Sequence, residues 1–178
     1  MKCWRTFDFE RRYGTNKILI YSLLLTMLFF SFSFALMQSL FSKTLYSGYF
    51  HFFLIALLAI YPLHKLVHLL PILHYWRQMK CRCKMTCYCM PIISINIKQP
   101  VPKRTFMVSL LLPFFTINPA LLICGMLFPH YIHYFTMLTA FHMGMCAIDL
   151  LYLKAMAASP KYAVIEEHDR GYEILIPQ

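Results

Sequence analysis

Apolar residues in this chain gather in long stretches separated by short polar segments, without the 3.6-residue or two-residue period of amphipathic helices and strands. A helix needs about 20 predominantly apolar residues to cross the hydrocarbon core of a bilayer. Four stretches are long enough, at about residues 18–41, 49–73, 106–128 and 131–156. We therefore predict an all-α membrane protein with four transmembrane helices, forming a single integral membrane domain over residues 1–178.

Two segments outside these stretches carry patterns typical of strands. In the loop 74–105, the Cys-Arg-Cys-Lys run at 81–84 and the isoleucines at 92, 93, 95 and 97 combine alternation with β-branched residues, which predicts a short β-hairpin. In the tail 157–178, apolar runs at 162–165 and 172–176 flank a polar turn that ends at Gly171. This pattern predicts a second short hairpin, with glycine at the turn.

Lys and Arg residues predict the orientation, because cytoplasmic loops retain them. Five precede the first stretch and seven lie in the segment 74–105, whereas Lys43 alone follows the first stretch. Both termini, the loop 74–105 and the tail are thus predicted to be cytoplasmic. The first apolar run exceeds the ~7–15 residues of a signal-peptide core and no A-x-A pattern follows it, so we expect it to remain as an anchor.

Composition agrees with a membrane location. The chain is 60% hydrophobic and only 13% charged, and a soluble domain with this composition would aggregate. Its net charge of +10 follows largely from the cytoplasmic Lys and Arg residues, which would attract anionic lipid head groups. We therefore expect the lipid bilayer, and other membrane proteins, as partners, and we expect no nucleic-acid partner.

Three ionisable side chains within the stretches are candidates for chemistry, because a charge inside a bilayer costs several kcal/mol. His64 and His68 are one helical turn apart, so both imidazoles project from one helix face about 6 Å apart. Asp149 is the one acidic residue in the four stretches, and counting residues places it at a depth similar to that of His64. Two His nitrogens and a carboxylate oxygen are a known zinc set with a fourth position free, so zinc is the predicted cofactor.

These residues resemble a family of small bacterial membrane proteins of unknown function that are described as zincin peptidases and are distantly similar to intramembrane site-2 metalloproteases. The segment His64–His68 looks like the H-E-x-x-H motif of that family, and Ile148–Leu150, followed by Tyr172–Ile174, looks like its ending. The resemblance begins at about Tyr61 and implies a bacterial cell membrane, zinc, and Asp149 as the third ligand. The chain departs from the motif at Lys65, where the family has the Glu that acts as general base.

An ammonium group has no lone pair with which to accept a proton, so Lys65 argues against peptidase activity. Our first hypothesis is a degenerate zincin-like membrane protein that binds metal and regulates, or binds, other membrane segments. The second is an active intramembrane metallopeptidase with an unusual base. The third is a structural or transport-related membrane protein without metal, in which Asp149 forms an ion pair with Lys65.

Cysteines give a weaker second candidate. The four in the loop 74–105 form a C-x-C-x-x-x-C-x-C pattern at Cys81, Cys83, Cys87 and Cys89. Plain packing, a four-thiolate metal site and juxtamembrane acylation are all compatible with it, whereas disulfides are not expected in a reducing cytoplasm. We expect Cys124 and Cys146 to be helix-packing residues.

Two further polar positions in the stretches have expected structural roles. Asn118 precedes Pro119, and this pair is expected to mark a local helix break. His142 lies two turns before Asp149 and could face the same cavity, although a hydrogen-bonded packing histidine is the favoured interpretation.

Overall fold

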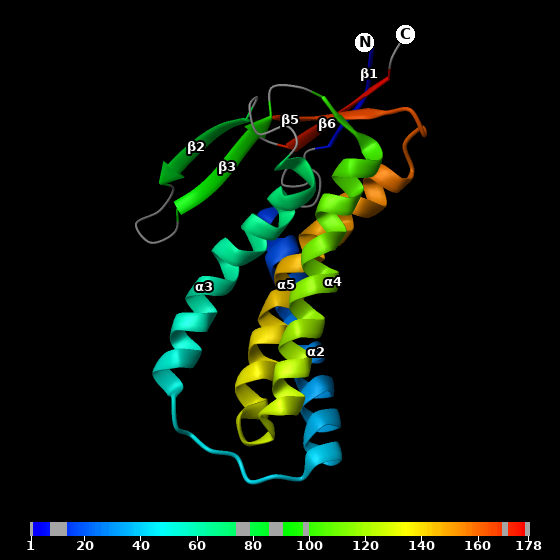
Figure 1. Ribbon diagram of the computed structural model, residues 1–178. Helices are drawn as coiled ribbons and strands as arrows, with labels where there is room; N and C mark the ends of the chain where they lie inside the picture. Colours follow the sequence, from blue (N-terminus) through cyan, green and yellow to red (C-terminus); the bar gives the residue numbers. More distant parts are fainter. Residues whose placement is uncertain are drawn as a thin grey trace.

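Four long helices dominate the computed structural model of the protein (Figure 1). The model describes residues 2–7, 14–73, 79–85, 91–97, 100–168 and 171–176, with the backbone alone at 2, 7, 79–85, 91–97, 167, 168 and 171. The helices are α2 (Thr15–Phe41), α3 (Phe50–Leu69), α4 (Lys103–Leu127) and α5 (Ile132–Ala157), with the 3-10 turn η2 (Pro129–Tyr131) before α5. All four are long and apolar enough to cross a membrane, which confirms the predicted number of spans in the described part of the chain.

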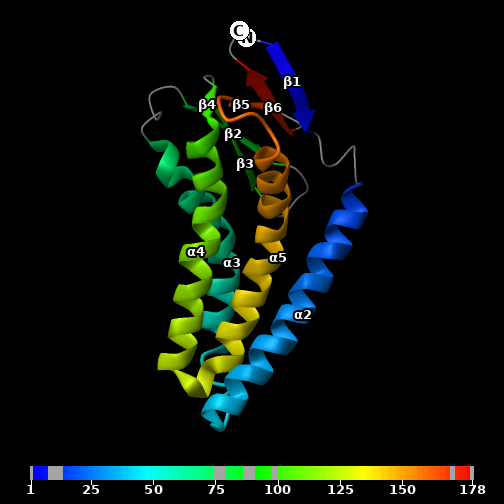
Figure 2. The ribbon, with the colours of Figure 1, turned by 90° about the vertical axis from the view of Figure 1, so that its right-hand side faces the viewer.

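Short strands form two antiparallel sheets at one end of the helices (Figures 1 and 2). The hairpin of β2 (Met79–Met85) and β3 (Pro91–Ile97) lies between α3 and α4, as predicted. The predicted C-terminal hairpin is also present, as β5 (Val164–His168) and β6 (Gly171–Ile176). It belongs to a larger sheet that was not predicted, of order β1-β6-β5-β4, which adds β1 (Lys2–Phe7) and β4 (Val101–Pro102).

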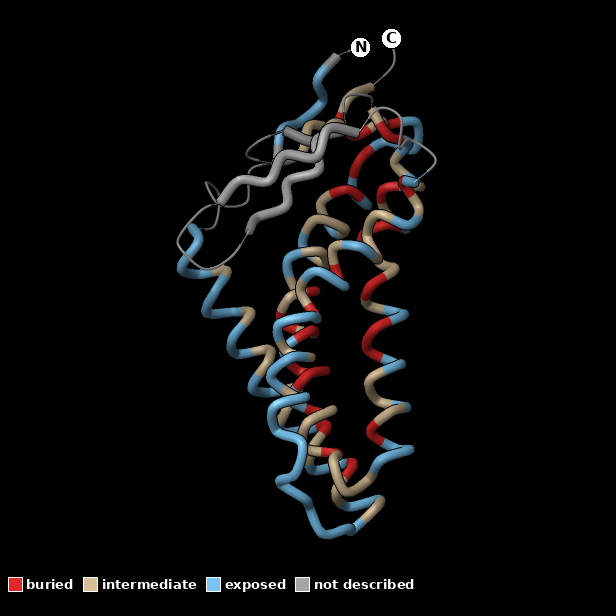
Figure 3. Tube along the Cα trace, turned by 60° about the vertical axis from the view of Figure 1, so that its left-hand side comes forward, coloured by how far each residue is buried: buried red, intermediate tan, exposed pale blue. Residues whose placement is uncertain are grey.

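Helices α4 and α5 form the centre of the bundle, with α3 packed on one side of the pair and α2 along α5 (Figure 2). Figure 3 shows the consequence for burial: buried positions lie mainly on α4 and α5, whereas α2 and α3 are largely exposed. The exposed residues are mostly large and apolar, including Leu28 and Leu58, at 70% and 72% exposed. Such apolar surfaces match the lipid tails of a bilayer core, which contains no water.

The four-stranded sheet closes the bundle at the same end as the β2–β3 hairpin. Ile165 and Ile174 form a cross-strand pair, and both are fully buried in a cluster with Phe106, Leu110 and Met156 from the ends of α4 and α5. Because successive side chains of a strand point to opposite faces, the next cross-strand pair, Glu166 and Glu173, lies on the face turned away from this cluster.

Prolines inside α4 do not break it. The helix runs without interruption through Pro113 and Pro119, so the expected break at Asn118–Pro119 is wrong. Asn118 instead turns its side-chain amide back along the helix and donates to the carbonyl of Phe114 at 3.2 Å. A proline has no N–H to donate to the carbonyl four residues earlier in a helix. In α4, Pro113 leaves the carbonyl of Ser109 without its helical donor in this way, and that carbonyl is part of the candidate site.

Candidate metal centre

The side chains of His64, His68 and Asp149 converge from two helices, although Asp149 follows His68 by 81 positions in the sequence. The two histidines lie one turn apart on α3, with their Nε2 atoms 2.9 Å from each other. Asp149 projects from α5, and its Oδ2 lies 3.2 Å from His64 Nε2 and 3.4 Å from His68 Nε2. The structure therefore brings together all three side chains that the sequence indicated.

Helix α4 fixes the orientation of His68. Nδ1 of His68 lies 2.8 Å from the carbonyl oxygen of Ser109. A carbonyl oxygen can only accept a hydrogen bond, so Nδ1 carries the proton. This carbonyl is free to accept because its usual helical partner would be the missing N–H of Pro113. The Ser109 hydroxyl in turn donates to the carbonyl of His68, in the last turn of α3. With Nδ1 protonated, the lone pair of neutral His68 is on Nε2, which faces Asp149.

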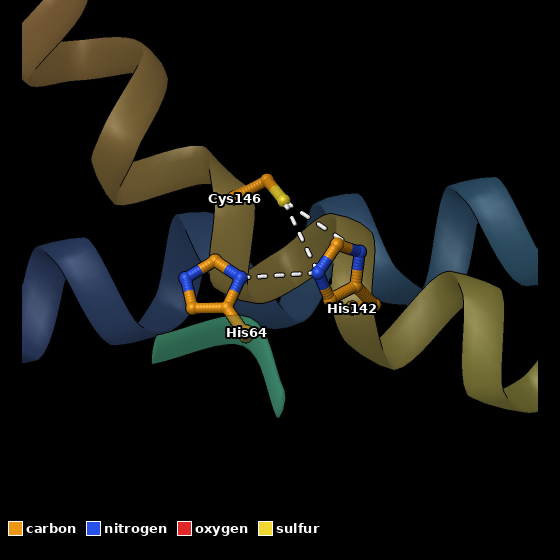
Figure 4. Close-up of side chains that lie close together, drawn as sticks. All are labelled: His64, His142 and Cys146. Carbon is orange, nitrogen blue, oxygen red and sulfur yellow. Dashed lines mark hydrogen bonds between the residues drawn. The ribbon is translucent and has the colours of Figure 1, made fainter. Parts of the chain in front are cut away.

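A chain of hydrogen bonds from Asn118 of α4 through His142 of α5 fixes the orientation of the His64 ring. The Asn118 amide nitrogen donates to Phe114 and Met143, so its oxygen accepts from His142 Nδ1 at 2.8 Å. His142 then has its lone pair on Nε2, which lies 3.0 Å from His64 Nδ1 and accepts the proton there (Figure 4). The lone pair of His64 is therefore on Nε2, facing the same point as those of His68 and Asp149.

Three acceptor atoms thus face one another with no donor between them. Asp149 Oδ2 is buried and has no hydrogen-bond partner among the described residues. Such a group needs a proton or a metal cation at its centre, because lone pairs at these distances repel. At zinc–ligand bond lengths of about 2.0–2.1 Å, neighbouring ligands of a tetrahedral ion lie about 3.3 Å apart. The observed separations of 2.9, 3.2 and 3.4 Å therefore fit a zinc ion with one position left open.

Lys65 follows His64 on α3 and is partly exposed. It forms no ion pair or hydrogen bond with other residues that the structure describes, and the Asp149 carboxylate contacts the two imidazoles. The ion pair between Asp149 and Lys65, which was the alternative explanation for a carboxylate inside the bundle, is therefore not formed.

A second group of candidate ligands shares His64. His64, His142 and Cys146 are all buried, and their ligating atoms lie within 4.8 Å of one another (Figure 4). His142 is hydrogen-bonded, as expected for the favoured packing role, and it also faces His64 near Asp149, which was the other possibility that its position allowed. Cys146 was expected only to pack between helices. The signal for this group is the spacing of four between His142 and Cys146, which places both on one face of α5.

The loop cysteines are only partly described. Cys81 and Cys83 lie in β2, where they pair with Ile95 and Ile93 of β3 along the backbone. Cys87 and Cys89 lie outside the described residues, so the candidate four-thiolate site remains a prediction. The second strand of the hairpin begins at Pro91, after these two cysteines.

Comparison with known proteins gives a match to one family. Its description is "Putative zincin peptidase", and the match covers residues 57–164, from the middle of α3 to the start of β5. No curated protein and no solved structure matched the chain. The matched range contains His64, His68 and Asp149 and the helices that carry them. It also contains the groups that orient the histidines, which are the backbone carbonyl of Ser109 and the side chains of Asn118 and His142. The chain therefore belongs to this family of zincin peptidases.

Proposed function

We propose that the protein is a zinc-binding membrane protein with a zincin-type site that does not hydrolyse peptides. His64, His68 and Asp149 hold the metal in this proposal, through Nε2, Nε2 and Oδ2. The observation that carries it is the convergence of three lone pairs on one point inside the bundle, with the two histidines oriented by His142 and by the Ser109 carbonyl. Zinc bound there would supply Lewis-acid chemistry, by polarising a carbonyl group at its open position.

The missing function is proton transfer. Zincin chemistry needs a group near the metal that accepts a proton and later donates it, and Lys65 occupies the position of that group in the family motif. A protonated lysine cannot accept a proton, and its positive charge opposes the binding of a cation nearby. Asp149, the one carboxylate of the four helices, is already committed as a ligand.

Glu166 and Glu173 of the C-terminal hairpin do not replace the base. Glu166 and Glu173 lie on the face of the sheet that is turned away from the helix ends. Ile165 and Ile174 lie on the opposite face, which packs on the ends of α4 and α5. To reach the histidines, the hairpin would have to flip by one residue in register and bury carboxylates in place of isoleucines.

A site without the base can still bind. A zinc ion with an open position would accept a carbonyl or carboxylate oxygen of another membrane segment without cleaving it. We therefore infer a regulatory or segment-binding role in a bacterial cell membrane, with the sheet end of the bundle in the cytoplasm, where the Lys and Arg residues favour it.

Metal analysis of the purified full-length protein, combined with a gain-of-function variant, tests the proposal. We expect about one zinc per chain. We expect the ion to be lost in His64→Ala, His68→Ala and Asp149→Ala, and retained in the control His51→Ala, an exposed histidine at the other end of α3. The wild type should leave a panel of fluorescent single-span peptides intact in proteoliposomes, and Lys65→Glu should begin to cleave them.

Zinc retained in all three alanine variants would remove the proposed site. Peptide cleavage by the wild type that disappears in His64→Ala would show an active peptidase with another base, and would overturn the non-hydrolytic part of the proposal.

A further inference from the structure

His64, His142 and Cys146 form a cluster of metal-ligating atoms deeper in the bundle than the zincin-type site. Their residues are 3%, 0% and 1% exposed, whereas the side chains of His68 and Asp149 are each 15% exposed. We propose that this cluster is a second metal position, selective for a soft monovalent cation, for which Cu(I) is the probe. It shares His64 with the zinc position, so the two positions exclude each other.

The donor geometry suits three-coordinate binding. His64 Nδ1 and His142 Nε2 lie 3.0 Å apart, and Cys146 Sγ lies 3.8 Å from His142 Nε2 (Figure 4). At metal–sulfur and metal–nitrogen bonds of about 2.3 Å and 2.0 Å, a trigonal ion separates sulfur from nitrogen by about 3.7 Å. The separation of the sulfur from Nε2 fits this value, but the sulfur also lies 3.7 Å from Nδ1 of the same ring, so the thiol has to turn towards the Nε2 lone pair as the ion binds. The two imidazoles also need to move apart by about half an ångström.

Asn118 leaves the His142 lone pair available to a metal. Its oxygen accepts a hydrogen bond from His142 Nδ1 at 2.8 Å, which keeps the proton on Nδ1, so Nε2 presents a lone pair towards His64 whether or not a metal is bound there. A metal at this position therefore leaves the hydrogen bond between Asn118 and His142 intact.

Charge and softness select the ion. Thiolate is a soft ligand that favours Cu(I), and imidazole accepts copper as well as zinc. A monovalent ion with one thiolate gives a neutral complex, whereas Zn²⁺ would leave one uncompensated positive charge in a dry, fully buried place. The thiol proton leaves to solvent as the ion binds, as in other thiolate sites.

The proton on His64 makes the two positions alternatives. A neutral imidazole has one lone pair, which is on Nε2 when zinc is bound beside Asp149 and on Nδ1 when copper is bound beside Cys146. In the copper-bound state the proton moves to Nε2, 3.2 Å from Asp149 Oδ2, and provides the donor that this buried oxygen otherwise lacks. The proposal extends the proposed zinc site but is tested separately from it.

Metal competition on the full chain tests the proposal. The background variant replaces Cys3, Cys81, Cys83, Cys87, Cys89 and Cys124 by serine, so that Cys146 is the one remaining thiol. Cu(I) and Zn²⁺ affinities are measured anaerobically against chelators. We expect Cys146→Ser to weaken Cu(I) binding at least about tenfold and leave zinc binding unchanged. We expect His68→Ala to do the reverse and His64→Ala to weaken both.

X-ray absorption at the copper edge keeps the test independent of how well a variant folds. The background protein loaded with Cu(I) should show one sulfur and two nitrogen neighbours. A copper shell without sulfur, an equal loss of Cu(I) binding in His68→Ala, or simultaneous binding of one zinc and one copper would each overturn the proposal. Copper bound through Cys146 in a protein that takes up no zinc would support this position and overturn the zinc site instead.

Discussion

At the scale of single residues, the candidate site depends on groups that do not themselves face the proposed metal position. His64 and His68 each use Nδ1 to donate a hydrogen bond, to His142 and to the Ser109 carbonyl, and this leaves Nε2 free to ligate. Partners of this kind set the tautomer and ring orientation of metal-binding histidines, and losing one typically costs about 10–100-fold in metal affinity.

Replacing Asn118 should therefore weaken zinc binding although Asn118 is not a ligand. Asn118→Leu removes the acceptor that fixes His142, and through it His64, so we expect zinc affinity to fall about tenfold in chelator competition. Asn118→Asp keeps an acceptor oxygen and should bind zinc more tightly than the leucine variant. Thr116→Val is the control, since Thr116 is exposed and bonds only within its own helix. Equal zinc affinity in Asn118→Leu and the wild type would contradict the relay.

The sequence predicts the three facing side chains but not the residues behind them. Spacing within α3 places His64 and His68 on one face, and charge cost singles out Asp149 among apolar residues. Asn118, Ser109 and His142 gain their roles from contacts between helices, and no spacing within one helix encodes such contacts. Zinc binding by the wild type and by the variants decides whether these three residues and the three ligands form a metal centre.

At the scale of elements, small and polar residues decide how closely the helices approach. Ser22 of α2 donates to the Gly144 carbonyl of α5 at 2.6 Å, and the Thr26 hydroxyl lies over the same glycine. Without a hydrophobic effect between helices in lipid, close contacts and hydrogen bonds of this kind drive their association. Four apolar helices could be predicted from the lengths of the apolar stretches, but such a stretch has no period that shows which face of the helix makes a contact of this kind.

A methyl group at Gly144 should therefore loosen α2 from α5. A Cβ there would overlap the Thr26 hydroxyl and approach the Ser22 carbonyl oxygen at 3.2 Å. We expect Gly144→Ala to lower the free energy of unfolding in detergent micelles by about 1–3 kcal/mol. Gly48→Ala is the matched control, because its Cβ would meet only Tyr131 at 3.9 Å. A Gly144→Ala protein as stable as Gly48→Ala would show that this contact does not hold α2.

At the scale of the whole molecule, both ends of the described chain lie on one side of the bundle, because β1 and β6 are neighbours in one sheet (Figures 1 and 2). The opposite side carries the α2–α3 connection, which contacts η2 and the start of α5: Tyr46 stacks on His130 of η2, and Tyr134 of α5 donates to the Ser47 carbonyl at 3.0 Å. Aromatic residues of this kind are typical of the boundary between membrane and water.

The basic residues predict which of these sides faces the cytoplasm. In a protein whose native cysteines are replaced by serine, Ser47→Cys should react with an impermeant maleimide added to intact cells. Lys161→Cys, which is exposed beside the sheet, should react only after lysis. The opposite labelling pattern would invert the proposed orientation and place the candidate site near the outer surface.

Pairing of β1 with β6 has a consequence for how the protein is made. Lys2–Phe7 leaves the ribosome before the four helices, whereas its backbone partner, Gly171–Ile176, is synthesised after them. The strand Lys2–Phe7 therefore has no partner in this sheet while the helices insert one after another, and it can pair only once Gly171–Ile176 has been made. Biogenesis of this protein thus has a late, long-range step, in which a strand made before the four helices pairs with one made after them.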